Sequence, residues 1–145
     1  TADRAEAAPP LPAAEYTLVY LWAVECAPCI KEMPILKGLL APYHDRKRLQ
    51  ILLISETLNR ATLERFLIRQ EQTLPAADYY QSTTRALRQA LGIEQQPLTL
   101  LLDSDGVVRQ AFIGSLLGRR EELLAALDRV AALHQRSHGS GHRRK

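Results

Sequence analysis

The sequence contains few cysteines and no long run of apolar residues. Its 145 residues include two cysteines, one tryptophan and one methionine. A structural zinc site needs about four ligands, so a single cysteine pair argues against one. No apolar run approaches the roughly eighteen residues that cross a bilayer, and the longest runs, LQILLI and LTLLL, have the length of core strands. We therefore expect no bound metal and no membrane-spanning helix in this sequence.

Basic charge is concentrated near one end of the chain. Lysine and arginine total 19 against 16 acidic residues, but four of the 19 lie within the last ten positions: Arg136, Arg143, Arg144 and Lys145. The rest of the chain carries 15 basic and 16 acidic side chains. A surface that follows a nucleic-acid backbone needs clustered positive charge, so we expect no nucleic-acid partner.

The composition, with 46% apolar and 24% charged residues, is that of one soluble globular domain. We expect this domain at 16–135, after a flexible Ala/Pro-rich lead-in at 1–15 and before a disordered basic tail at 136–145. His134, His138 and His142 recur every four residues, but two glycines in the tail argue against a helix that would align them for a metal. The chain starts at Thr1 without a signal-peptide pattern, so we expect a processed or trimmed product.

Hydrophobic periodicity and turn residues predict alternating strands and helices. We expect strands at 16–23, 49–55, near ADYY and in PLTLLLD and GVVRQAFIG, and helices from the cysteines to about Leu40, after Asn59, in TTRALRQALG and at 118–135. Ser104-Asp105-Gly106 predicts a tight turn between the last two strands. This order predicts an α/β fold with a central mixed sheet flanked by helices on both faces.

The two cysteines form a CxxC motif, Cys26-Ala27-Pro28-Cys29, between a predicted strand and a predicted helix. At a helix N-terminus, the dipole and free N–H groups lower the pKa of the first thiol. Pro28 stiffens the loop, and the second cysteine can resolve a mixed disulfide formed by the first. Two buried structural thiols are the alternative, but CxxC within a βαβ pattern is typical of a redox site.

The segment WAVECAPCIKEMP resembles the active-site segment of thioredoxin-fold proteins, and specifically the TlpA/ResA/CcmG (DsbE-type) group of bacterial envelope thiol-disulfide oxidoreductases. The KEMP that follows the second cysteine selects this group. A second segment, LGIEQQPLTLLLDSDGVVRQAFIG, resembles the group's cis-proline segment. The resemblance covers 16–135 and implies a thioredoxin fold with the group's α-β insertion, here at 59–80.

The resemblance also implies roles for individual residues. Cys26 is then the attacking thiol and Cys29 the resolving thiol. Pro97 is expected to be cis and to lie against the disulfide, while Gln96 offers its backbone to an extended client peptide. Trp22 is expected to pack beside the site, although a tryptophan at a strand end also suits a core position.

Three departures from the group's pattern bear on chemistry. Glu25 stands where an aromatic residue is common, and a carboxylate beside Cys26 disfavours its thiolate, which favours a reducing protein. Tyr20 occupies the position where thioredoxin keeps a buried aspartate as proton acceptor. Glu25 and Glu32 are therefore the candidate proton acceptors for Cys29. Gln95 and Gln96 replace a common glycine before the proline, and their amides are expected to contact the partner.

These observations predict a protein-disulfide reductase of the bacterial periplasm or envelope, without a cofactor. The resemblance implies protein clients with disulfides, such as those of cytochrome c biogenesis, and a membrane electron donor of the DsbD or CcdA kind. A monomer is expected, with a membrane anchor in the full-length protein as an option. Three alternatives stay open: a copper(I)-handling protein, a disulfide oxidase or isomerase, and a binding module with a structural disulfide.

Overall fold

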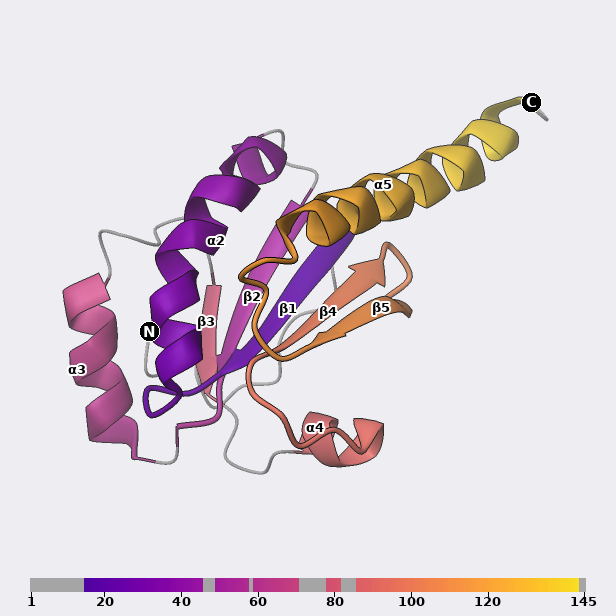
Figure 1. The fold of residues 1–145 in the computed structure, drawn as a ribbon. Helices are drawn as coiled ribbons and strands as arrows, with labels where there is room; N and C mark the ends of the chain where they lie inside the picture. The colour runs from indigo at the N-terminus through magenta and orange to yellow at the C-terminus, as the bar shows by residue number, and fades with distance from the viewer. Residues whose placement is uncertain (1–14, 46–48, 58, 71–77, 82–85, 144–145) are drawn as a thin grey trace.

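The computed structural model describes residues 15–45, 49–57, 59–70, 78–81 and 86–143. Its helices and strands alternate along the chain as the sequence predicts (Figure 1): β1 (Tyr16–Trp22), α2 (Ala27–Asp45), β2 (Leu49–Ser55), α3 (Arg60–Gln70), β3 (Asp78–Gln81), α4 (Ala86–Leu91), β4 (Leu98–Asp103), β5 (Val108–Ile113) and α5 (Arg120–Arg143). The α3–β3 pair is the insertion expected at 59–80.

The strands form one mixed sheet in the order β3-β2-β1-β4-β5. β1, β2 and β3 are parallel, while β4 runs antiparallel to both β1 and β5. β1 is central, and all seven of its residues are buried, as expected for a strand covered on both faces. Parallel β1 and β2 need a crossover connection, and α2 provides it.

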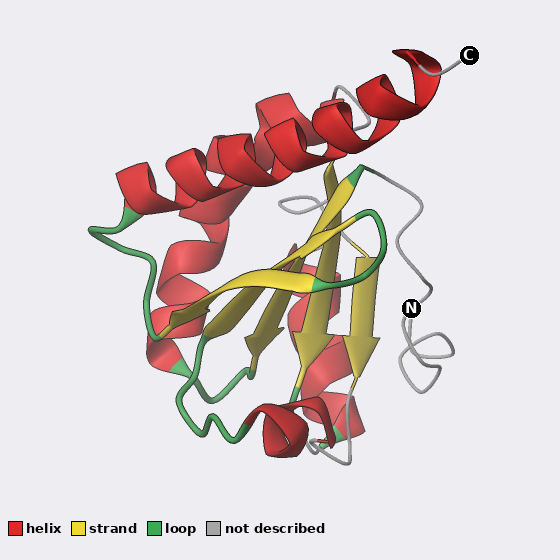
Figure 2. Cartoon of the chain, turned by 90° about the vertical axis from the view of Figure 1, so that its right-hand side faces the viewer, coloured by secondary structure: helices red, strands yellow, loops and turns green. Residues whose placement is uncertain are grey.

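Two apolar clusters cover the two faces of the sheet. The larger cluster joins alternate β1 residues, such as Leu18 and Tyr20, to side chains of α2, α3 and α5. Figure 2 shows α5 lying across one end of this helical layer. The smaller cluster contains Val19 and Leu21 with residues of β2 and β4, and Ile93, which follows α4, packs against it. Helices therefore flank both faces, and the predicted fold class is confirmed.

The residues predicted to cap and turn the chain do so. Asn59 begins α3, and its Oδ1 accepts the N–H of Thr62 at 3.0 Å. Gly92 ends α4 in the left-handed region, with φ of 69°, and donates its N–H to Arg88 O at 2.9 Å. Gly106 also has positive φ, 81°, in the β4–β5 turn. These local signals position the elements around the cysteine pair.

Two helices are longer than the sequence predicts. α2 continues through Pro34 and Pro42 to Asp45, not about Leu40. α5 runs to Arg143, so the prediction of a disordered tail is wrong for the backbone of 136–143. Each glycine costs about 1 kcal/mol in a helix interior, but extending an existing helix adds a hydrogen bond per residue, so Gly139 and Gly141 do not end it. The lead-in at 1–14 and residues 144–145 lie outside the described residues.

Within the described ranges, each helix is too short or too polar to span a bilayer. α5 is the longest helix in the described part of the chain. It is polar as a whole because charged residues lie beside the apolar stripe that packs on the core.

Asp103 closes the β4–β5 turn and should make the stability of the fold sensitive to acid. Its Oδ1 accepts the N–H groups of Asp105 and Val107 at 2.9 and 3.0 Å, and Arg109 Nε donates to its Oδ2 at 2.7 Å. Burial alone raises the pKa of Asp103, but these donors and the Arg109 charge outweigh burial and lower the pKa below its ordinary value.

A lowered folded-state pKa stabilises the fold above the unfolded-state value, about 3.9, and this contribution is lost as pH falls through the folded-state value. We expect Asp103→Asn to lower the free energy of unfolding by about 1–2 kcal/mol at pH 7. The difference should shrink as pH falls through the folded-state pKa of Asp103, because Asp103 itself is then protonated. Urea denaturation from about pH 2 to 7 measures this, and an equal difference at every pH would contradict it.

Candidate active site

The cysteine pair lies where β1 ends and α2 begins, at the lower end of the sheet in Figure 1. Cys26 and Cys29 form a disulfide with Cα atoms 5.3 Å apart. Cys26 is the N-cap of α2, because Ile30 N–H donates to its carbonyl at 3.2 Å and Cys29 N–H donates to its Sγ at 3.3 Å. The helix therefore directs an N–H group and its positive end at the Cys26 sulfur, which stabilises negative charge there.

The two sulfur-bearing residues differ in exposure. Cys26 is half-buried, whereas Cys29 is fully buried in the larger apolar cluster. Trp22 belongs to the same cluster, is fully buried, and packs on Phe66 of α3 with ring centroids 5.1 Å apart. Trp22 is thus a core residue beside the pair. One sulfur is accessible to a large substrate and the other lies beneath it.

Glu32, one turn after Cys29 on α2, is a buried carboxylate with 1% exposure. Tyr20 Oη donates to its Oε1 at 2.5 Å, and Ser115 Oγ and Leu116 N–H donate to its Oε2 at 2.7 and 2.8 Å. Burial, together with the bond to Glu32 and its charge, raises the pKa of Tyr20 well above the ordinary value. Tyr20 therefore stays a protonated donor to Glu32, on the face of α2 that carries Cys29.

The remaining residues of the cysteine loop are exposed. Glu25, Ala27 and Pro28 all face solvent around Cys26. The two carboxylates considered for proton transfer are therefore placed differently: Glu25 lies at the rim, and Glu32 is enclosed and held by three donors.

The loop before β4 completes the site from the other half of the chain. The Gln96–Pro97 peptide bond is cis. β4 pairs with β1 so that Leu98 lies opposite Leu21, which places Pro97 level with Trp22, at the edge of the sheet from which the cysteine loop leaves. Gln95 is exposed and Gln96 half-buried, and the Gln96 side chain donates to Glu56 Oε1 at 2.8 Å.

Sequence reasoning did not identify four residues at this edge of the sheet as site residues: Tyr20 as the partner of Glu32, and Ser115, Glu56 and Arg88. The sequence shows that Tyr20 departs from the pattern of the group, but it does not show that Tyr20 bonds to Glu32. Glu56 directly follows β2, in which every residue but Gln50 is buried, and a charged residue at such a position could have drawn attention to it. Arg88 had none, because α4 was expected to bury its apolar residues; instead Leu91 is 36% exposed and Arg88 is 1% exposed.

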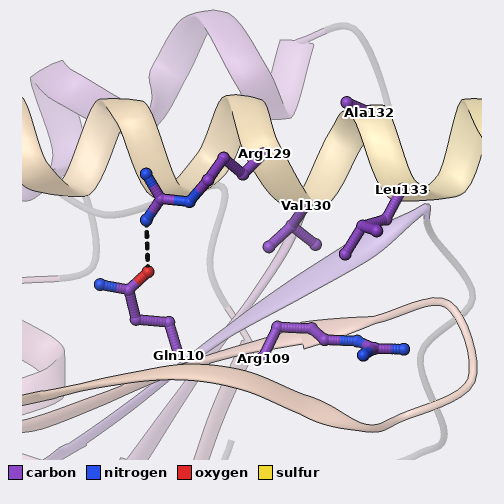
Figure 3. A pocket seen from close by; sticks show the side chains of 6 residues that line it. All are labelled: Arg109, Gln110, Arg129, Val130, Ala132 and Leu133. Carbon is purple, nitrogen blue, oxygen red and sulfur yellow. Dashed lines mark hydrogen bonds between the residues drawn. The ribbon is translucent and has the colours of Figure 1, made fainter.

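A pocket between β5 and α5 is separate from the site. It is lined by Arg109, Gln110, Arg129, Val130, Ala132 and Leu133, and none of the predicted site residues contributes to it. Figure 3 shows Arg129 directed at Gln110, and the hydrogen bond between them is 2.6 Å long. Arg109 pairs with Asp103, which the figure does not draw. Arg109 is thus paired with an acidic residue, and Arg129 is bonded to a neutral side chain.

A parallel β1–α2–β2 unit, a β4–β5 hairpin followed by α5, and a cis-proline level with a CxxC motif together define a thioredoxin-type fold. Among the described residues, no group of three histidine, cysteine or acidic side chains is arranged to hold a metal.

Known structures share this fold, although no protein-family model and no curated protein matches the sequence. A protein assigned as the thiol:disulfide interchange protein DsbE of Chlorobium tepidum is 18% identical, with a TM-score of 0.70 over 81% of each chain. StoA of Bacillus subtilis is 20% identical, with a TM-score of 0.61 over 76% of this chain and 84% of its own. An exposed lipoprotein thioredoxin of Streptococcus pneumoniae is 13% identical, with a TM-score of 0.60 over 75% and 85%. At these identities the likeness establishes the fold alone.

Proposed function

We propose that this protein is a thiol-disulfide oxidoreductase that reduces disulfides in other proteins. The observation that carries the proposal is the pair itself: a half-buried Cys26 that caps a helix, disulfide-bonded to a fully buried Cys29. A purely structural disulfide has no need for a helix N-terminus aimed at its outer sulfur. One protein of similar structure is assigned as a thiol:disulfide interchange protein, which agrees with this proposal.

The reaction is a two-electron exchange. In the reduced protein, the Cys26 thiolate attacks one sulfur of a client disulfide, and the other client sulfur leaves as a thiolate that takes up a proton. Cys29 then loses its proton and attacks Cys26 Sγ, which releases the second client thiolate. The client gains two electrons and two protons, and the protein is left with the Cys26–Cys29 disulfide. A dithiol donor must then reduce it.

The charges around the pair favour the reducing direction. Glu25 is next to Cys26 and Glu32 follows Cys29 by one turn, so two carboxylates flank the cysteines. Ala27 and Pro28 supply no cation. Negative charge disfavours the thiolate form, and a dithiol whose reduced form is less stabilised is a stronger reductant.

The setting and partners extend this proposal. We place the protein outside the bacterial cytoplasm, in the periplasm or envelope, where client disulfides persist; one similar structure is an exposed lipoprotein. Its clients would be disulfide-bearing proteins of the kind handled in cytochrome c biogenesis. A membrane donor of the DsbD or CcdA kind would return the pair to its dithiol form.

An equilibrium redox titration tests the direction. The protein is held in defined thiol buffers, and free Cys26 and Cys29 thiols are counted by alkylation and mass shift. We expect a potential at or below that of thioredoxin, about −270 mV. A value near that of DsbA, about −120 mV, would make the protein an oxidase. If no disulfide formed, the redox proposal would fall and copper(I) binding would be measured next.

A further inference from the structure

A buried ion pair joins the end of β2 to α4. Glu56 is the first residue after β2 and is 7% exposed, while Arg88 of α4 is 1% exposed. Arg88 Nε donates to both carboxylate oxygens of Glu56, at 3.1 and 2.8 Å, and its Nη2 donates to Oε1 at 2.7 Å. Arginine presents a planar fork that suits this double contact.

The same pair holds the loop that precedes Pro97. Arg88 Nη1 donates to the carbonyls of Ile93 and Gln95, at 3.0 and 2.5 Å. Gln96 Nε2 donates to Glu56 Oε1 at 2.8 Å. Three of the four residues between Gly92 and Pro97 are therefore bonded to a single buried ion pair.

The segment that carries Glu56 also holds the cysteine loop. Glu56 N–H donates to Trp22 O at 2.6 Å, and Val24 N–H donates to Thr57 Oγ1 at 2.8 Å. Residues 56–57 are thus bonded on one side to the chain leading into Cys26, and on the other, through Glu56, to the chain leading into Pro97. The spacing between these two loops depends on this contact.

The exposed parts of the 93–96 loop lie where a client chain must pass. In the strand register, Pro97 lies level with Trp22. The half-buried Cys26 follows Trp22 by only four residues in the chain. Glu94 and Gln95 are exposed, and Ile93 and Gln96 are half-buried. We expect a polypeptide whose disulfide reaches Cys26 to contact this rim, whereas a small disulfide can react without contacting it.

We propose that Glu56 and Arg88 are positioning residues that fix the 93–96 loop for contact with an extended peptide, and so set the protein's preference for polypeptide disulfides over small ones. This inference rests on the proposed function. A purely structural pair is the competing explanation. The two explanations predict different results for a variant in which apolar side chains of similar volume replace the pair, an exchange that often leaves stability unchanged or raises it.

The experiment compares two substrates of the reduced protein. One is a synthetic peptide with a single disulfide in an extended segment, and the other is 5,5′-dithiobis(2-nitrobenzoate), which has no peptide backbone. Single-turnover rates are followed against substrate concentration, which gives a half-saturation concentration and a limiting rate for the peptide. Glu56→Gln, Gln96→Ala and the double variant Glu56→Leu/Arg88→Met are compared with the wild type.

For the double variant we expect a midpoint in urea close to that of the wild type, because both members of the ion pair are replaced together by apolar side chains of similar volume. Its half-saturation concentration for the peptide should still rise about tenfold, while its limiting rate and its rate with the small disulfide change less than twofold. Gln96→Ala removes only the hydrogen bond from the Gln96 side chain to Glu56. It should therefore give a smaller rise in the half-saturation concentration for the peptide.

The ion pair between Asp103 and Arg109 provides the matched control. It closes the β4–β5 turn at the opposite end of β4 from Pro97. Replacing both residues with leucine and methionine should change stability and leave the ratio of the two substrates unaltered.

The outcomes separate this inference from the proposed function. If the wild type reduces both substrates, and the Glu56/Arg88 variants lose activity toward both in proportion or toward neither, the pair is structural. The inference is then overturned, while the proposed function stands. If the wild type reduces neither substrate, the oxidoreductase proposal falls, and the inference falls with it.

Discussion

Replacing Cys29 with serine is expected to trap the reduced protein on its client as a stable mixed disulfide. The half-buried Cys26 can still attack a client disulfide, but the buried serine hydroxyl cannot displace the client sulfur from Cys26. Incubation with a disulfide-bearing peptide should therefore give a species whose mass is that of the protein plus one peptide thiol. Non-reducing mass spectrometry measures it, and dithiothreitol should dissolve it.

Cys26→Ser is the matched variant, since it removes the exposed sulfur and keeps the buried one. It should form no adduct, and its rate of peptide reduction should fall by at least about a thousandfold, as loss of a covalent nucleophile does in other enzymes. An adduct that formed on Cys29 in this variant, and not on Cys26 in the other, would reverse the two roles.

Glu32→Gln is expected to slow the second half of the reaction, in which Cys29 releases the client. Cys29 must lose a proton in a water-poor environment, and Glu32 is the buried carboxylate one turn away on the same helix face. Removing a positioned general base typically costs a factor of about 100 or more. Rapid mixing of the reduced protein with the peptide, followed by Trp22 fluorescence, separates formation of the mixed disulfide from its release by Cys29 and so measures this step.

Two variants control for structure and for charge. Glu25→Gln removes the exposed carboxylate and should change the resolution rate less than twofold. Tyr20→Phe keeps Glu32 but takes away one of its three donors, so it should slow resolution less than Glu32→Gln does. Urea denaturation of each variant shows whether a slower rate accompanies unfolding. Equal effects of Glu25→Gln and Glu32→Gln would assign the proton to neither residue in particular.

The sequence was sufficient for those features that depend on neighbours in the chain. The apolar run of β2, the Asn59 cap, the turn at Gly106 and the CxxC motif are each specified within a few residues, and the structure has them where they were expected. The order of these elements predicted an α/β fold with a central sheet, and the resemblance of two segments to thioredoxin-fold proteins predicted the thioredoxin fold.

Contacts between distant residues could not be predicted in this way. Arg88 and Glu56 are 32 positions apart, and a six-residue helix with several apolar positions gives no reason to expect its arginine to be the buried side chain. Tyr20 and Glu32 are brought together only by the crossover from β1 to α2. The length of α5 was missed because glycine weakens a helix without necessarily ending it.

The three hydrogen-bond donors to Glu32 also determine at which stage of folding the site around Glu32 is complete. Tyr20 is 12 residues from Glu32, but Ser115 and Leu116 are 83 and 84 residues away, in the segment that leads into the last helix. A contact of such long sequence separation closes a long loop of chain and carries the corresponding loss of chain entropy. A chain still emerging, or one whose C-terminal part has come away, therefore carries the two cysteines without an enclosed carboxylate one turn beyond them. Full activity then belongs only to a chain that has completed its folding.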